Sequence, residues 1–194
     1  MEEFMKRVWI TGYRSYELNV FKDNDPKVKI IKEVLKKALK VRLEQGSDEF
    51  WVISGPQMGA ERWGIEVALE LKLEFPEIRT ALMQPFAEFG SQWNDSNKLK
   101  LTNITQQVDF SADVSDKPYQ SPQQLRNYQQ FMLTHTDEAI LLYDPEFEGK
   151  TKYDYQAIKR YEEQANYSLE LIDFDELQEE AEVWEERQRE KGGF

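Results

Sequence analysis

The sequence contains no cysteine and a single histidine, His135. The absence of cysteine excludes disulfides, thiol nucleophiles and thiolate metal ligands. One histidine cannot build a multi-histidine metal centre, and no acid or nucleophile accompanies it at a readable spacing, so we interpret it as structural. Magnesium on carboxylates stays open as a class of chemistry, but no residue pattern marks a metal site and we predict none.

Long apolar runs and positive charge are also scarce. No stretch approaches the roughly 20 apolar residues of a membrane-spanning helix, and the acidic segment 1–6 is not typical of a signal peptide. The chain has 25 Lys and Arg against 37 Asp and Glu, a net charge of −12. Binding along an extended nucleic acid needs clustered basic residues, so the acidic balance disfavours it. Binding of one small nucleotide in a local pocket remains compatible with this charge. We expect a cytoplasmic protein without membrane insertion.

The 194 residues suffice for one compact domain with a sizeable core. Short apolar runs predict strands at 8–10, 50–53, 79–83, 139–143 and 168–172, with a weaker strand at 106–110. Amphipathic segments between them predict helices at 26–45, 57–74, 93–101, 122–134 and 152–164.

Alternation of apolar strands and amphipathic helices predicts an α/β fold. Its mostly parallel sheet would carry helices on both faces, in three layers α/β/α. We assign residues 1–174 to this single domain and 175–194 to a charged C-terminal helix or tail. That segment is either a solvated acidic tail or a docking site for a protein partner. A homodimer also stays open.

The turn after the second predicted strand is the most informative segment. Residues 51–64 read WVISGPQMGAERWG, so a strand ends at Ser54 and Gly55, and Gly59 and Glu61 lie at the start of a helix. Glycine in a first helical turn costs about 1 kcal/mol, which indicates close backbone approach. We expect the amides of 55–59 to hold phosphate, and Gly59→Ala to weaken binding while leaving the fold intact.

Other turns should emerge at the same edge of a parallel sheet, where ligands bind at a topological switch point. The first strand is followed by Thr11, Gly12 and Arg14, and the fifth by Gly149 and Thr151. Arg126 and Asn127 belong to the helix that enters the fifth strand. The glycines could instead serve only the turns, and Arg126 could be an ordinary surface arginine.

Several of these residues resemble the SLOG superfamily, which joins the DNA-processing protein DprA to the LOG phosphoribohydrolases. The Ser54–Glu61 turn matches its Ser-Gly turn with a second glycine and an acid. Arg126-Asn127 matches its Arg-Asn pair, and Gly149-Lys150-Thr151 loosely matches its Gly-Ser/Thr turn. The resemblance implies a Rossmann-like fold and a nucleotide ligand.

A narrower resemblance, over about residues 7–175, is to the YpsA family of Firmicutes. It is carried by ITGYR at 10–14, the Ser54–Glu61 turn, PYQSP at 118–122 and LLYDPE at 141–146. This resemblance implies a nucleotide or derivative such as ADP-ribose or an NAD-related molecule. A cell-division link proposed for the family would make the chain a ligand sensor.

Two departures bear on catalysis and on DNA binding. LOG enzymes carry Pro-Gly-Gly-x-Gly-Thr-x-x-Glu after the strand that corresponds to 139–143, and here the double glycine and the acid are missing. The net charge of −12 does not suit the single-strand DNA binding of DprA. We therefore favour a nucleotide-binding protein. In it Glu61 would accept hydrogen bonds from a ribose, and Arg126 would pair with a phosphate. The alternative is a hydrolase of an N-glycosidic bond with Glu61 as its acid or base.

Overall fold

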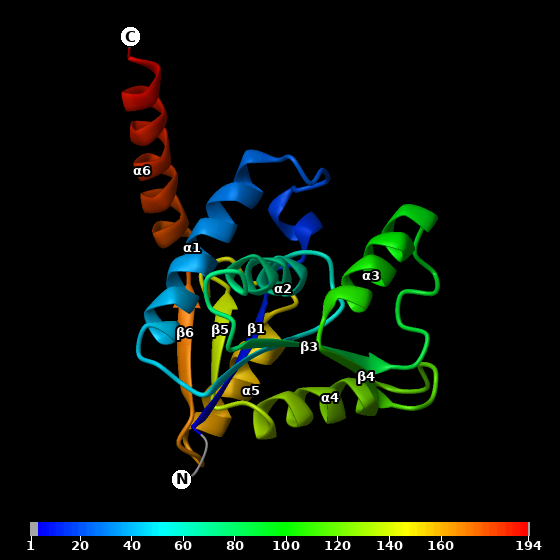
Figure 1. The fold of residues 1–194 in the computed structure, drawn as a ribbon. Helices are drawn as coiled ribbons and strands as arrows, with labels where there is room; N and C mark the ends of the chain where they lie inside the picture. The colour runs from blue at the N-terminus through cyan, green and yellow to red at the C-terminus, as the bar shows by residue number, and fades with distance from the viewer. Residues whose placement is uncertain (1–3, 194) are drawn as a thin grey trace.

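A computed structural model describes residues 4–193 of the chain. Its centre is a six-stranded, all-parallel sheet in the order β4-β3-β2-β1-β5-β6 (Figure 1). The strands are β1 (Met5–Gly12), β2 (Glu49–Ser54), β3 (Ile78–Phe86), β4 (Phe110–Ser115), β5 (Glu138–Leu142) and β6 (Ser168–Ile172).

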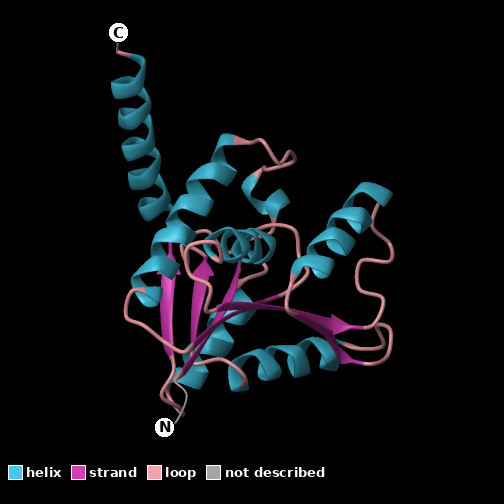
Figure 2. Ribbon diagram, viewed as in Figure 1, coloured by secondary structure: helices cyan, strands magenta, loops and turns pink. Residues whose placement is uncertain are grey.

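Helices cover both faces of this sheet (Figure 2). They are a 3₁₀ turn η1 (Ser15–Leu18), α1 (Pro26–Leu43), α2 (Ala60–Leu71), α3 (Asp95–Gln107), α4 (Pro122–Thr134), α5 (Lys152–Glu162) and α6 (Phe174–Gly192). In Figure 1 the helices α1, α2 and α3 lie on one face, and α4 and α5 on the other. The predicted three-layer, Rossmann-like α/β architecture is confirmed.

The strand order places the topological switch point at β1. This strand pairs with β2 on one side and β5 on the other, and at its carboxyl end Gly12 lies opposite Leu142. The chain therefore leaves β1, β2 and β5 at the same edge, where such folds bind ligands. Buried Tyr143 lies at this edge directly after β5, whereas buried Trp9 and Phe50 lie deeper in the core.

The helix α6 differs from the others because it is strongly acidic and mostly exposed. Within it Glu180 is buried and contacts Lys37 of α1. Beyond this contact the helix projects away from the body of the fold (Figure 1). Among residues 4–193, no helix combines the length and apolarity needed to cross a bilayer.

Several boundaries differ from those predicted, and two of these differences have a local explanation. The weak strand at 106–110 is wrong, because α3 continues to Gln107 and β4 begins at Phe110. The helix reaches this far because Ile104, near its end, is buried against the core, while the Asn94 side chain caps its start by accepting a hydrogen bond from Asn97 N at 2.8 Å. The second predicted helix begins at Ala60 rather than at residue 57, since Gly59 has a non-helical φ of +126°.

The turn after β1 lies directly against Gly59. The Ser15 amide donates to Met58 O at 3.0 Å, and the Ala60 amide donates to Tyr13 O at 3.0 Å. A Cβ at Gly59 would lie 2.7 Å from Ser15 N and 2.8 Å from Arg14 Cα. The close backbone approach predicted at this glycine is therefore an approach of the chain to itself.

This packing predicts that Gly59→Ala destabilises the fold, contrary to the expectation drawn from the sequence. The collision and the positive φ together should lower the free energy of unfolding by roughly 3 kcal/mol. Gly46 is the matched control, because its φ is +81° but a Cβ there meets nothing within 4 Å. Gly46→Ala should cost about 1 kcal/mol. Urea denaturation measures both, and equal losses would contradict the proposed collision.

Candidate functional site

The loops after β1 and β5 are joined over the switch point. The Tyr13 amide donates to Leu142 O at 3.0 Å, and the Tyr13 hydroxyl donates to Phe147 O at 2.6 Å. The Glu17 carboxylate accepts a hydrogen bond from the Lys150 amide at 2.9 Å. Because Gly149 lies against Glu17, with only 2.6 Å between the carboxylate and a Cβ built there, these loops pack as one unit.

The turn after β2 is filled by side chains of the protein itself. A Cβ at Gly55 would collide with the Glu61 carboxylate and would lie 2.5 Å from the Tyr128 hydroxyl. The Gln57 amide donates to Glu61. The Glu61 carboxyl group and the Tyr128 hydroxyl therefore lie against Gly55, in the turn where we expected amides to hold phosphate.

A polar cluster lies next to this turn, and five segments contribute to it. We define the edge cluster as Thr11 of β1, Arg14, Glu61 of α2, Tyr128 of α4 and Asp154 of α5. Thr11 and Glu61 are buried, and the other three are partly buried. The Gln129 amide donates to the Asp154 carboxylate at 2.7 Å and fixes its orientation.

Burial and like charge perturb the acids of the edge cluster. Burial raises the pKa of Glu61 to about 7, the Asp154 charge adds to this rise, and Arg14 opposes it. Burial also raises the pKa of Asp154, against the Gln129 hydrogen bond and the Arg14 charge. Near neutral pH, Glu61 therefore exchanges between a proton donor and a hydrogen-bond acceptor.

The hydroxyl of Tyr128 is buried and makes no hydrogen bond to any residue in the described part of the chain. Burial and the neighbouring carboxylates Glu61 and Asp154 raise its pKa well above the ordinary value, so it stays protonated. A phenol and two carboxyl groups that converge in this way suit the hydroxyl groups of a sugar, which both donate and accept. Within residues 4–193, no group of three or more acidic or histidine side chains could hold a metal ion.

The remaining predicted residues split between this edge and the surface. Ser54 donates to Ile10 O and ties β2 to β1. Gly12 lies where a Cβ would meet Leu142 O at 2.5 Å, and Thr151 is a buried N-cap of α5. These three residues shape the sheet edge but are not among the polar groups that converge there.

Arg126 and Asn127 lie on the exposed side of α4. The Arg126 guanidinium donates to the Gln123 side chain at 2.9 Å, and the Gln123 amide donates to Asn127 at 2.8 Å. Within residues 4–193, neither side chain forms a hydrogen bond or an ion pair with a member of the edge cluster. The α4 residue that reaches Gly55 is Tyr128, one position further on.

Sequence reasoning missed Tyr128 and Asp154, although helical spacing carried a signal for both. Tyr128 is four residues before buried Met132, and Asp154 is three and four residues before buried Ala157 and Ile158. Residues at these steps share one helix face. A polar side chain on a core-facing stripe near the carboxyl edge was the pattern to find.

Comparisons with known proteins agree with this architecture. A model of the YpsA family, described as the YspA SLOG family, matches residues 8–177. A UPF0398 protein of Limosilactobacillus reuteri is 74% identical over 190 residues, which cover 98% of this chain and 100% of that protein. A UPF0398 protein of Lactobacillus johnsonii is 57% identical over 185 residues, covering 95% and 98% of the two chains. The chain belongs to the YpsA SLOG family.

The raised pKa of Glu61 predicts how stability depends on pH. Between pH 4.5, the ordinary pKa of Glu61, and about pH 7, its pKa in the folded chain, the folded chain holds a proton that the unfolded chain has lost. The contribution of Glu61 to the free energy of unfolding is therefore fully present below pH 4.5. It is lost, by roughly 3 kcal/mol in all, as the pH rises through 7. Glu61→Gln removes this contribution.

The measurement is the free energy of unfolding in urea at pH 5, 6, 7 and 8. Relative to the natural chain, Glu61→Gln should gain stability from pH 5 to about pH 7, and the difference should level off by pH 8. Glu163→Gln, which changes an exposed acid on the surface, should follow the natural chain at every pH. Parallel curves for the natural chain and Glu61→Gln would contradict a raised pKa at Glu61.

Proposed function

We propose that this member of the YpsA SLOG family binds a nucleotide derivative, such as ADP-ribose or an NAD-related molecule, at the carboxyl edge of its sheet. The observation that carries the proposal is the edge cluster, in which Glu61, Asp154 and the unpartnered Tyr128 hydroxyl converge beside Gly55. Family membership supports a small-molecule ligand, and the cluster supports a sugar as the part of it that is recognised.

The charges of the cluster decide which part of a nucleotide it would meet. A phosphate would be repelled by Glu61 and Asp154, whereas ribose hydroxyls would donate to these carboxyl groups. In dinucleotide-binding folds, an acid near this edge binds a ribose in the same way. Arg14 is partly exposed and its charge acts on both acids. It replaces Arg126 as the cation placed to balance the ligand's phosphate.

A role as a ligand sensor follows from the loops that surround the cluster. Arg14 belongs to the turn that contacts Gly59, and Glu17, three residues later, binds the loop after β5. A ligand that draws Arg14 toward itself would shift both contacts together. Binding would in this way change the surface of the edge, which a protein partner could read.

Isothermal titration with ADP-ribose, NAD and AMP tests the binding. We expect heat with at least one of them, and Tyr128→Phe should weaken the affinity roughly 3- to 10-fold, since one hydrogen bond of about 1 kcal/mol is lost. Tyr153→Phe is the matched control, because that tyrosine is 60% exposed one residue before Asp154. No heat at millimolar nucleotide, or equal affinities for Tyr128→Phe and the natural chain, would refute the proposal.

The pKa of Glu61 favours one alternative, a hydrolase that cleaves an N-glycosidic bond. A carboxyl group with a pKa of about 7 beside a second carboxyl group can donate a proton to a leaving base at neutral pH. The missing LOG motif weighs against this function.

Chromatography of AMP and NAD after incubation with stoichiometric protein separates the two functions. Our proposal predicts unchanged nucleotide. Release of free base by the natural chain, lost in Glu61→Gln and kept in Glu163→Gln, would establish the hydrolase instead.

A further inference from the structure

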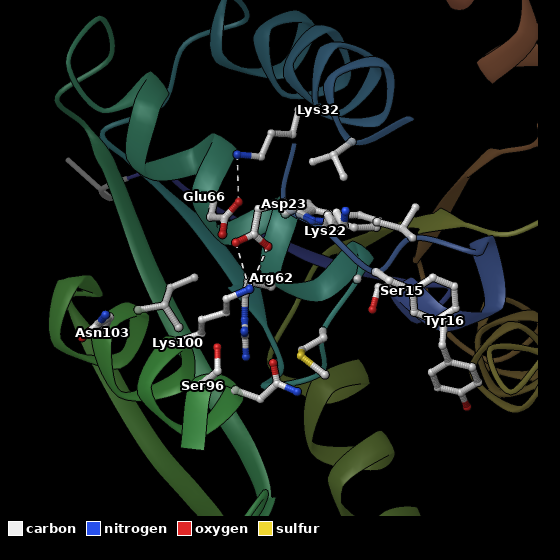
Figure 3. A pocket seen from close by; sticks show the side chains of 18 of the residues that line it. Ser15, Tyr16, Lys22, Asp23, Lys32, Arg62, Glu66, Ser96, Lys100 and Asn103 are labelled. Carbon is white, nitrogen blue, oxygen red and sulfur yellow. Dashed lines mark hydrogen bonds and ion pairs between the residues drawn. The ribbon is translucent and has the colours of Figure 1, made fainter. Parts of the chain in front are cut away.

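A groove borders the start of α2, and Gly59, Arg62 and Trp63 are among the residues that line it. It has a volume of about 1000 Å³ and runs between α2, α3 and the segment that joins η1 to α1 (Figure 3). Glu61 faces the edge cluster, whereas Arg62, the next residue, lines the groove. Neither Tyr128 nor Asp154 lines it. A volume of this size is at the upper end of small-molecule sites.

The face of α3 that borders the groove is polar. Asn97, Lys100, Ile104 and Gln107 line the groove at three- and four-residue steps, and among them only Ile104 is buried. The core-facing stripe of a surface helix is ordinarily apolar. A polar stripe here means that α3 does not seal against α2 and that the space between them has hydrogen-bonding walls.

Arg62 carries a buried positive charge into this space. It is 7% exposed, and its guanidinium donates to Pro56 O at 3.3 Å. No carboxylate within residues 4–193 lies within 4.0 Å of it as an ion-pair partner. Burial lowers its pKa, against the more distant charges of Glu66, Asp23 and Glu61. A buried charge without an ion pair is costly, and an anion in the groove would relieve that cost.

Three lysines line the groove together with Arg62. Lys100 pairs with Asp23 at 2.8 Å and so links α3 to the segment before α1. Asp23 is 83% exposed, and an exposed pair of this kind contributes little to stability. Lys100, Arg62 and Ser96 all line the groove, and they are labelled in Figure 3. Lys32 is already engaged by Glu66 at 2.8 Å, and Lys22 and Glu70 complete the charged groups of the lining.

Aromatic side chains form another wall. Trp63 and Tyr16 line the groove together with Phe21, which is 76% exposed. Exposed phenylalanine at the lip of a polar groove offers a flat apolar surface to a planar ring. The groove thus combines an anion-binding end with an aromatic end.

We propose that this groove is a second ligand site, separate from the edge cluster, for a small molecule that carries phosphate and a planar ring. The phosphate binds Arg62 and Lys100 beside the first turn of α3, where Ser96 and Asn97 lie. Lys100 leaves Asp23 to do so. The ring lies against Phe21, the most exposed of the aromatic side chains that line the groove.

Titration calorimetry with inorganic pyrophosphate tests the anion-binding end alone, because this probe has no sugar or base. We expect binding by the natural chain that weakens as salt is raised, at least a 10-fold loss in Arg62→Gln, and a several-fold loss in Lys100→Gln. Lys159→Gln, an exposed lysine on α5 that pairs with Glu162, should bind as the natural chain does. ADP should bind more tightly than pyrophosphate, and Phe21→Ala should remove that advantage.

The variant Tyr128→Phe distinguishes binding in the groove from nucleotide binding at the edge cluster. That variant should bind pyrophosphate unchanged, since its substitution lies in the edge cluster. Lys100→Gln alters an exposed pair, so its loss of affinity cannot be ascribed to misfolding. No heat from the natural chain at millimolar pyrophosphate would overturn the second site. Unchanged affinity in both Arg62→Gln and Lys100→Gln would overturn it as well.

Discussion

The contact between Gly59 and the backbone of Tyr13–Ser15 positions the start of α2 and the loop after β1 at the carboxyl edge of the sheet. It sets where α2 begins, because Gly59 adopts a conformation that ends the loop and Ala60 donates to Tyr13 O. It also holds the turn after β1 above the switch point, where Tyr13 and Glu17 contact the loop after β5. Three loops that are far apart in sequence are thereby connected at one edge.

From this start, the first turn of α2 presents opposite charges to two different surroundings. Glu61 joins Asp154 and Tyr128 in a cluster that is rich in acceptors, and Arg62 enters a groove with other cations. Successive helical residues are separated by about 100°, so neighbouring side chains face different surroundings. A chain with a net charge of −12 can in this way keep a local site for an anion.

Much of the fold could be predicted from the sequence because apolar runs such as 139–143 and stripes such as that of α1 depend on local periodicity. The arrangement of the carboxyl edge was harder to predict. A glycine in the sequence indicates that another group packs closely against the backbone, but it does not identify that group. At Gly59 the neighbour is the chain itself. Likewise, Arg126 and Tyr128 differ by two positions, and only the phase of α4 against the sheet decides that Tyr128 faces inward.

A crystal structure of the protein with ADP-ribose tests the central claim most directly. The account predicts a ribose at the edge cluster, with a hydroxyl within about 3 Å of the Tyr128 oxygen and another near the Glu61 carboxylate. A ribose bound elsewhere, with the Tyr128 hydroxyl still without a partner, would contradict it.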